Sequence, residues 1–425
     1  PAMGAHESTP AYKEQVDGAA VESSTVRRVR AANLLTVRTV SMYHAPIDDF
    51  QGSLKMIKAK SLYLMLFLVP FAFASEYLEW GAATVFSLSC LAILPLAGLL
   101  GDATEQVALH TNETLGGLLN ATFGNATELI VCLFALQKGL LSVVQVSLLG
   151  SILSNTLLVL GCACIAGGIS APQIKFNQVA AQANTTLLQI AVLGLVVPTM
   201  MESVGQLSVQ GDDLATDLIL SRTISVAFLI LYVFYIYFQL FTHRAVFEEE
   251  AANGEEEEEE EKLLSLHGAV GWLLAITILI AMVSEFLTGA IDEAAKEFRL
   301  SETFVGFVII PIVGNAAEHS TAIVMAAKGK MDLAFGVALG SSTQIALFVI
   351  PTCVLVGLAI DQPLDLYFGV YETTITFLST LIVSQVVTDG ETNWLEGVML
   401  IFSYFIICLS FFFYHSEHVT GSSML

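Results

Sequence analysis

The chain has 425 residues, of which 55% are hydrophobic and only 13% are charged, and its mean hydropathy is +0.72. So apolar a composition excludes an ordinary soluble domain and indicates that the bilayer is the solvent. The formal net charge of −23 mostly reflects ten glutamates within residues 248–261, so it says little about the rest of the chain.

The N-terminal residues 1–58 are polar and carry an arginine cluster at Arg27, Arg28 and Arg30. No apolar run follows this cluster at the distance typical of a secretory signal. We therefore predict a polar cytosolic N-terminal tail.

Uncharged stretches recur along the rest of the chain. Several of them reach the roughly 20 residues that a helix needs to cross a hydrocarbon core about 30 Å thick. Because a helix pairs its own backbone polar groups, these stretches predict an all-α polytopic membrane protein. We expect about eleven transmembrane helices, at residues 59–76, 79–101, 116–137, 145–168, 180–200, 219–242, 265–289, 303–326, 333–360, 370–388 and 394–414.

The predicted organisation is a first extra helix followed by two inverted five-helix repeats. The repeats are 79–242 and 265–414, joined by an acidic cytosolic loop at 243–264, and 415–425 form a C-terminal tail. With the N-terminus in the cytosol, thirteen of the 17 Lys and Arg residues lie on the cytosolic side, as the positive-inside rule requires. The glutamate run in the loop is either a solvated, flexible segment or a weak surface that concentrates or senses Ca2+.

The internal repeat is the most informative feature. The sequence GNATE begins at Gly124 and GNAAE begins at Gly314, 190 residues later, and no gap is needed to align them. The same offset pairs Leu149-Gly150-Ser151 with Leu339-Gly340-Ser341, and Asp102 with Asp292. Because five predicted spans separate the two motifs, the chain passes through them in opposite directions, as in transporters whose site lies where two inverted halves meet.

Each motif places a glycine, an amide and a carboxylate on one face of a helix, with Glu128 in the first copy and Glu318 in the second. A carboxylate at the centre of a membrane helix costs about 2.5–3.5 kcal/mol on insertion scales, so such groups usually mark a pathway. No Lys or Arg lies at the same depth in the predicted spans. A bound cation or a proton is therefore the expected neutraliser.

The oxygens of this site suit Ca2+. Carboxylates, amides, water and carbonyls freed at Gly124, Gly314 and Pro311 supply the oxygen shell that Ca2+ prefers. Two nearby carboxylates also resist simultaneous ionisation, so at least one holds a proton when the cation is absent. Competition of Ca2+ and protons for the same oxygens is the minimal chemistry of an exchanger.

Other polar residues accompany the motifs. His319, beside Glu318, has no counterpart in the first copy, and it either tunes the site or only packs. The spans that follow the motifs carry Ser151, Ser154, Asn155, Ser341, Ser342 and Gln344, which either join helices or support the site. The six cysteines lie in apolar runs, so we expect them to pack as small hydrophobes.

These motifs, with the segments 149–161 and 340–349, resemble the cation/proton exchanger branch of the Ca2+/cation antiporter superfamily. The resemblance covers roughly residues 60–414. It implies that Glu128 and Glu318 bind Ca2+ or protons, with backbone carbonyls at Gly124 and Gly314 as further Ca2+ ligands. It also implies polar partners at Asn125, Asn315, Ser341 and Gln344. It also implies Ca2+/H+ antiport by alternating access at a vacuolar or other acidic-organelle membrane.

Three alternatives remain at this point: a sodium/calcium exchanger of the same superfamily, a Ca2+ channel and an intramembrane enzyme. The lack of a hydroxyl between Gly314 and Glu318 speaks against separate Na+ sites, and therefore against a sodium/calcium exchanger. The inverted halves speak against a channel. The sequence contains no catalytic motif that would indicate an enzyme.

The expected partners are Ca2+, H+ and lipid, with Mn2+ as another transportable divalent ion and no cofactor or nucleic acid. Homo-oligomer formation and a regulatory partner of the tail stay open.

Overall fold

The computed structural model describes residues 48–204, 213–247 and 261–413. The expectations for the tail 1–47, for most of the glutamate run and for 414–425 concern residues outside these ranges. The elements in chain order are α2 (Asp49–Ala59), η1 (Ser61–Phe67), α3 (Leu68–Tyr77), α4 (Ala82–Ala108), α5 (Glu113–Phe123), α6 (Ala126–Gln137), α7 (Leu141–Leu153), η2 (Ser154–Val159), α8 (Leu160–Gly168), β1 (Ile174–Lys175), α9 (Gln178–Ser203), α10 (Asp213–Tyr237), η3 (Phe238–Thr242), α12 (Leu266–Phe298), α13 (Glu302–Phe304), η4 (Val305–Ile309), α14 (Ile310–Gly314), α15 (Ala316–Ala327), α16 (Met331–Gln344), η5 (Ile345–Val349), α17 (Ile350–Ala359), α18 (Val370–Val386), β2 (Glu391–Thr392) and α19 (Trp394–Phe413).

The described chain is a polytopic helical membrane protein, as predicted. Eight of its helices are long and apolar enough to cross a membrane, and two bent helix pairs bring the number to as many as ten. The bent pairs are Asp49–Ala59 with Ser61–Tyr77, and Glu302–Gly314 with Ala316–Ala327. A further apolar helix, α18, has 17 residues. The exact count of eleven spans stays a prediction.

Helix ends differ from the predicted spans where charged residues lie inside a helix. The fourth helix, α4, continues to Ala108, although the predicted span ends at 101 before Asp102. Asp102 is accommodated because Lys60 donates to it at 2.6 Å and the Tyr63 hydroxyl also donates to it. These two donors lie on or beside η1, a 3₁₀ helix that begins the first predicted span.

The 190-residue offset recurs in the backbone. The helices α4 and α12 end at Ala108 and Phe298, which are equivalent positions. The π-helical segments η2 and η5 are also equivalent, and such segments are frequent at functional sites. The turns after α6 and α15 place Gly139 at φ 74° and Gly329 at φ 79°, the left-handed region that glycine adopts without strain.

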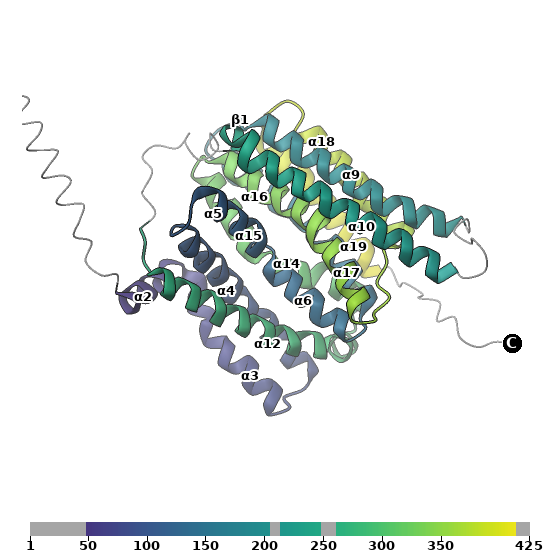
Figure 1. The fold of residues 1–425 in the computed structure, drawn as a ribbon, viewed down its shortest axis with the longest axis horizontal. Helices are drawn as coiled ribbons and strands as arrows, with labels where there is room; N and C mark the ends of the chain where they lie inside the picture. Colours follow the sequence, from purple (N-terminus) through teal and green to yellow (C-terminus); the bar gives the residue numbers. More distant parts are fainter. Residues whose placement is uncertain (1–47, 205–212, 248–260, 414–425) are drawn as a thin grey trace, which may run out of the picture. The chain divides into compact units, whose positions relative to one another are not determined.

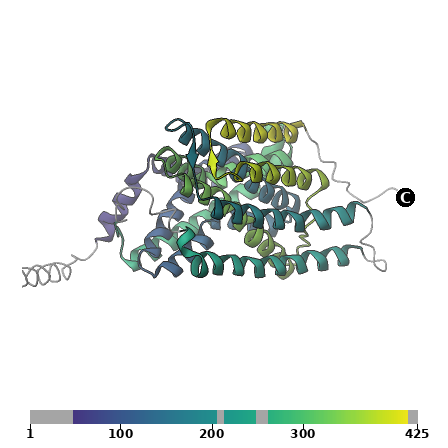
Figure 2. The same cartoon turned by 90° about the horizontal axis from the view of Figure 1, so that it is seen from above.

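Helix packing follows the repeats (Figures 1 and 2). The equivalent helices α4 and α12 pack against each other, as do α9 and α18. The contact between α8 and α19 has its counterpart between α10 and α17. The buried side chains form two apolar cores, one around α4 and α12 and the other among α6–α10 and α16–α19. The two motif segments lie between these cores.

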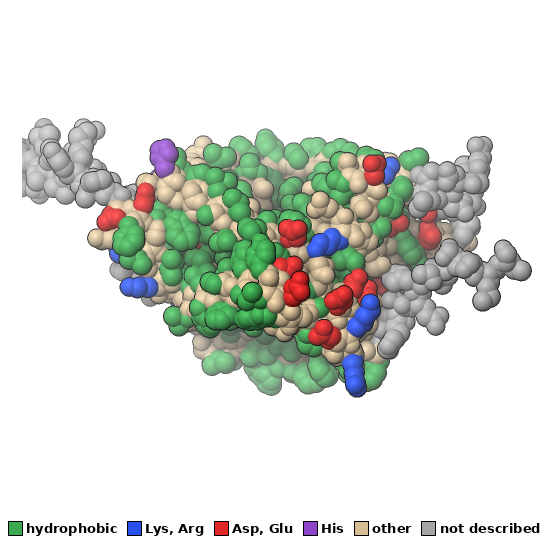
Figure 3. All heavy atoms as spheres, turned by 90° about the horizontal axis from the view of Figure 1, so that it is seen from below, with side chains coloured by type: hydrophobic (Ala, Val, Ile, Leu, Met, Phe, Trp, Pro, Cys, Tyr) green, Lys and Arg blue, Asp and Glu red, His purple; other side chains and the backbone are tan. Residues whose placement is uncertain are grey.

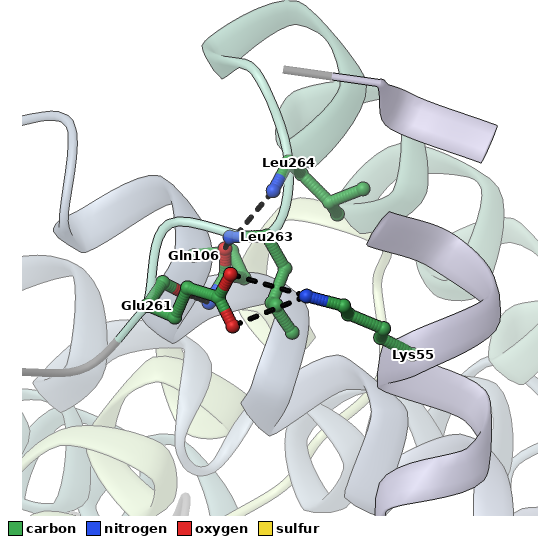
Figure 4. Close-up of polar contacts among 5 residues, drawn as sticks. All are labelled: Lys55, Gln106, Glu261, Leu263 and Leu264. Atoms are coloured by element: carbon green, nitrogen blue, oxygen red, sulfur yellow. Dashed lines mark hydrogen bonds and ion pairs between the residues drawn. The ribbon is translucent and has the colours of Figure 1, made fainter. Parts of the chain in front are cut away.

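At one end of the helices, residues 261–265 contact both α2 and the end of α4 (Figure 4). Gln106 Oε1 accepts from the backbone N–H of Leu263 at 2.8 Å and of Leu264 at 3.3 Å. Lys55 pairs with Glu261 at 3.1 Å. A Cβ on Gly52 would lie 1.8 Å from the Leu263 carbonyl oxygen, so only glycine allows α2 to approach this closely. We call this end the N-terminal side and the other end the opposite side.

Exposed apolar side chains cover the lateral surface. In the face shown in Figure 3 apolar side chains predominate, and most charged side chains gather toward one end. On α3 and α12 the exposed apolar residues include Phe71, Leu274 and Ile278. Such surface is expected where lipid, rather than water, surrounds the helices.

Candidate cation site

Both motifs lie at breaks in their helices. The first helix is interrupted between α5 and α6 at Gly124 and Asn125, and the second between α14 and α15 at Asn315, where the axis bends by 55°. Each new helix begins at an alanine, so Glu128 and Glu318 lie in the first turns of α6 and α15.

The chain enters the two breaks from opposite sides. The segment leading into the first is α5, which follows the end of α4 on the N-terminal side. The segment leading into the second is 302–314, which follows the end of α12. Because α12 begins on the N-terminal side and has 33 residues, a length of about 50 Å, its last residue lies on the opposite side.

Glu128 is buried without a partner. The residue is 5% exposed, and neither carboxylate oxygen has a hydrogen-bond partner among the described residues. It reaches across to the second motif, because a Cβ on Gly314 would lie 3.3 Å from Glu128 Oε1. A cavity of about 20 Å³ adjoins the carboxylate and is lined by Ile93, Glu128, Val131, Cys132, Ser147, Ser151, Leu287, Ile310, Val313 and Gly314. This volume holds about one water or one ion.

Glu318 is half-buried, and the charge of Glu128 acts on it directly. Its Oε2 atom has no hydrogen-bond partner within the described ranges. The ion pairs found in those ranges involve neither glutamate. Two neighbouring carboxylates in a dry region are costly unless a cation or a proton neutralises them.

The motif amide of the first repeat binds the second repeat. Asn125 donates through Nδ2 to Gln344 Oε1 at 2.5 Å, and its Oδ1 accepts from the Ser341 hydroxyl at 3.0 Å. Ser341 Oγ in turn accepts from Asn155 Nδ2 at 3.0 Å. Three of the predicted polar partners, the buried Asn125 and Ser341 and the half-buried Gln344, therefore form one hydrogen-bonded chain, and Asn155 extends it.

The motif amide of the second repeat binds the first repeat in the equivalent place. Asn315 donates through Nδ2 to the Ser151 carbonyl oxygen at 3.3 Å, and Ser151 is the counterpart of Ser341. Beside it, His319 Nε2 and Ser154 Oγ are 3.0 Å apart. Each motif is thus fixed to the helix that follows the other motif.

The two glycines of the motifs differ in their surroundings. Gly314 is buried against Glu128, whereas Gly124 is exposed. Among the described residues, a Cβ on Gly124 would meet within 4 Å only the carbonyl atoms of Asn120 in its own segment. The sequence gives both glycines one role, but the structure brings only Gly314 next to a motif glutamate.

Sequence reasoning did not predict which helices the polar partners would join. The offset of 190 pairs Ser151 with Ser341, but it does not indicate that Asn125 binds Ser341 and that Asn315 binds Ser151. The repeat itself could have indicated these contacts, because inverted halves meet at equivalent surfaces.

No group of three or more His, Cys, Asp or Glu side chains that would suit a metal ion occurs within the described residues. A cation at this site would take its remaining ligands from carbonyls, amides and water.

Unpaired carboxylates where two inverted repeats meet define a secondary transporter of cations. Comparison with known proteins agrees, because residues 81–241 and 268–413 match the family described as "Sodium/calcium exchanger protein". The chain belongs to this family, whose members are transporters.

The similar proteins include the "Vacuolar calcium ion transporter" of Schizosaccharomyces pombe, 44% identical over 364 residues, which cover 85% of this chain and 87% of the relative. The "Ca(2+)/H(+) antiporter" of Synechocystis sp. is 40% identical over 369 residues, with coverage of 84% and 98%. Among solved structures, the selenium-substituted Ca2+/H+ antiporter protein YfkE is 36% identical with a TM-score of 0.70, and the match covers 83% of this chain and 98% of that chain.

Proposed function

We propose that this protein exchanges Ca2+ for protons across a membrane, with Glu128 and Glu318 binding either Ca2+ or protons. The observation that carries the proposal is the pair itself: two neighbouring carboxylates from opposite repeats, buried or half-buried, with no cationic side chain paired to either among the described residues. A divalent cation neutralises both charges at once, and protons neutralise them when the cation leaves.

The names of the relatives support the same coupling. Proteins 40–44% identical over most of the chain carry the names vacuolar calcium ion transporter, vacuolar cation/proton exchanger and Ca(2+)/H(+) antiporter. The second motif also has no hydroxyl between Gly314 and Glu318, so few oxygens are left for separate Na+ sites. The protein is a transporter and performs no enzymatic conversion of its substrate.

The membrane is that of the vacuole or another acidic organelle, and the N-terminal side faces the cytosol. Two arguments support this placement: relatives from yeast and rice carry vacuolar names, and thirteen of the 17 Lys and Arg residues fall on the N-terminal side of the predicted spans. Protons moving out of the acidic lumen then drive Ca2+ into it. The site also accepts Mn2+, which prefers the same oxygen ligands.

The test is uptake of radioactive Ca2+ by purified protein in liposomes with an acidic interior, in the presence of increasing unlabelled Ca2+, Mn2+ or Mg2+. We expect uptake only with the pH gradient, with inhibition by Ca2+ first, then by Mn2+, and least by Mg2+, because Mg2+ dehydrates reluctantly. Equal uptake with and without the gradient would contradict exchange and favour a channel.

A further inference from the structure

The short helix α2 is nearly perpendicular to the segment that follows it. The axis bends by 105° between α2 and Ser61–Tyr77. That segment packs along α4, which is long and apolar enough to span the membrane. With 11 residues, α2 is only about 16 Å long, roughly half of the hydrocarbon thickness. A short helix in this orientation lies along the membrane surface and does not cross the bilayer.

The contacts of α2 place it at the level of the membrane–water interface. Trp272, near the start of α12, donates through Nε1 to the Ser53 hydroxyl oxygen at 2.7 Å. Tryptophan concentrates at this interface, because its ring is apolar and its N–H is polar. Lys55 pairs with Glu261, in the segment that leads into α12 (Figure 4). Figure 1 shows α2 beside the beginning of α12.

Three faces can be distinguished on α2. Gly52 and Met56 are one turn apart and form the face that is buried in the protein. Phe50 and Leu54 are one turn apart on a second face, where they are 72% and 40% exposed. The exposed Lys58 lies one further turn along, at the edge of this second face. Apolar side chains flanked by lysine are typical of helices that lie in a membrane interface.

We infer that α2 docks on the lipid surface of the N-terminal side, with Phe50 and Leu54 inserted among the acyl chains and Lys58 at the level of the lipid phosphates. The inference goes beyond the proposed exchange and does not depend on it. The lipid surface supplies apolar contact and negative charge at successive depths, in the same order as the side chains of α2 require them.

The charges around α2 support this partner. Lys262, in the neighbouring segment, is also exposed. The ion pairs found within the described ranges involve neither Lys58 nor Lys262, whereas Lys55 is paired with Glu261. An acidic protein segment would match the lysines, but it would leave Phe50 and Leu54 against charged groups. A phospholipid surface matches both kinds of side chain.

The test measures depth with an environment-sensitive fluorophore attached to Leu54→Cys or Lys58→Cys in the full chain. Lys328→Cys is the control, because Lys328 is exposed in the turn between α15 and α16, outside any interfacial helix. The six native cysteines are buried or half-buried, and the parent treated in parallel gives their background. The vesicles are phosphatidylcholine with a nitroxide quencher either high on the acyl chain or on the headgroup.

We expect the acyl-chain nitroxide to quench the Leu54 label at least about twofold more than the Lys328 label, because interfacial helices bury their apolar face about 5–10 Å deep. The headgroup nitroxide should quench the Lys58 label more than the acyl-chain nitroxide does. Quenching of the Leu54 label by aqueous iodide instead of by lipid would overturn the inference. Shielding of that label from both quenchers would also overturn it, because another protein segment would then cover the face.

A second variant tests the apolar contact itself. Phe50→Gln should reduce lipid quenching of the Leu54 label by about twofold, since it removes the larger inserted side chain. Phe241→Gln, at an exposed phenylalanine of η3, should leave this quenching unchanged. Both changes lie at exposed positions, so the thermal transition is expected to stay close to that of the parent. Unchanged quenching in Phe50→Gln would contradict insertion of this face.

Discussion

Glu128 and Gly314 belong to different repeats, yet a Cβ on Gly314 would lie 3.3 Å from Glu128 Oε1. The first carboxylate therefore rests against the backbone of the second motif, in a contact that leaves little room. Because the glycine sets where this carboxylate lies, its replacement is a direct probe of the site.

Gly314→Ala is expected to displace the Glu128 carboxylate and to weaken Ca2+ transport by about tenfold, because overpacking of this kind costs about 1–3 kcal/mol. The measurement is the Ca2+ concentration dependence of uptake in liposomes. Gly101→Ala on α4 is the control, since a Cβ there meets no described atom of another element within 4 Å. An unchanged apparent affinity in Gly314→Ala would show that Glu128 does not hold the ion in this position.

Glu128→Gln and Glu318→Gln are each expected to abolish exchange. Glutamine keeps the size of the side chain, but it supplies neither the charge that balances Ca2+ nor a group that titrates. Membrane insertion and thermal stability are measured alongside uptake, and we expect both to be preserved because removing an unpaired buried charge does not destabilise the fold. Near-parental uptake by folded Glu318→Gln would rule out the paired mechanism.

The hydrogen bonds between the repeats yield a third prediction. Gln344→Ala leaves the Asn125 amide without its 2.5 Å partner, and a buried donor without a partner costs about 1–3 kcal/mol. We expect a lower unfolding temperature and slower exchange. In a double-mutant cycle, Asn125→Ala combined with Gln344→Ala should cost less than the sum of the two single changes. Additive effects would mean that the two side chains act independently.

The glutamate run yields a fourth prediction. Most of it, 248–260, lies outside the described residues, but its last member, Glu261, is exposed and pairs with the exposed Lys55. Exposed ion pairs contribute little. Replacement of the ten glutamates within 248–261 by glutamine should therefore change the apparent Ca2+ affinity or activation modestly and leave exchange intact. Loss of exchange in a well-inserted variant would place this loop in the core mechanism.

The sequence was sufficient to predict the helical membrane fold, because long uncharged stretches allow no other class. The family resemblance also implied Asn125 and Ser341 as polar partners of the site; the structure joins them by a hydrogen bond of 3.0 Å, and their role in transport stays a prediction. Other features depend on tertiary contacts that no local pattern encodes. The continuation of α4 past Asp102 depends on Lys60 and Tyr63, and the close approach at Gly150 depends on the packing of 302–314 against α7.

The coupling ion is the central claim, and it is measured most directly by comparing two gradients in the same liposome preparation. One sample has an acidic interior and no sodium on either side, and the other has equal pH and a sodium gradient. We predict Ca2+ accumulation in the first, abolished by a protonophore with charge-balancing ions, and little or none in the second. Accumulation driven by sodium and indifferent to the pH gradient would contradict the proton role of Glu128 and Glu318.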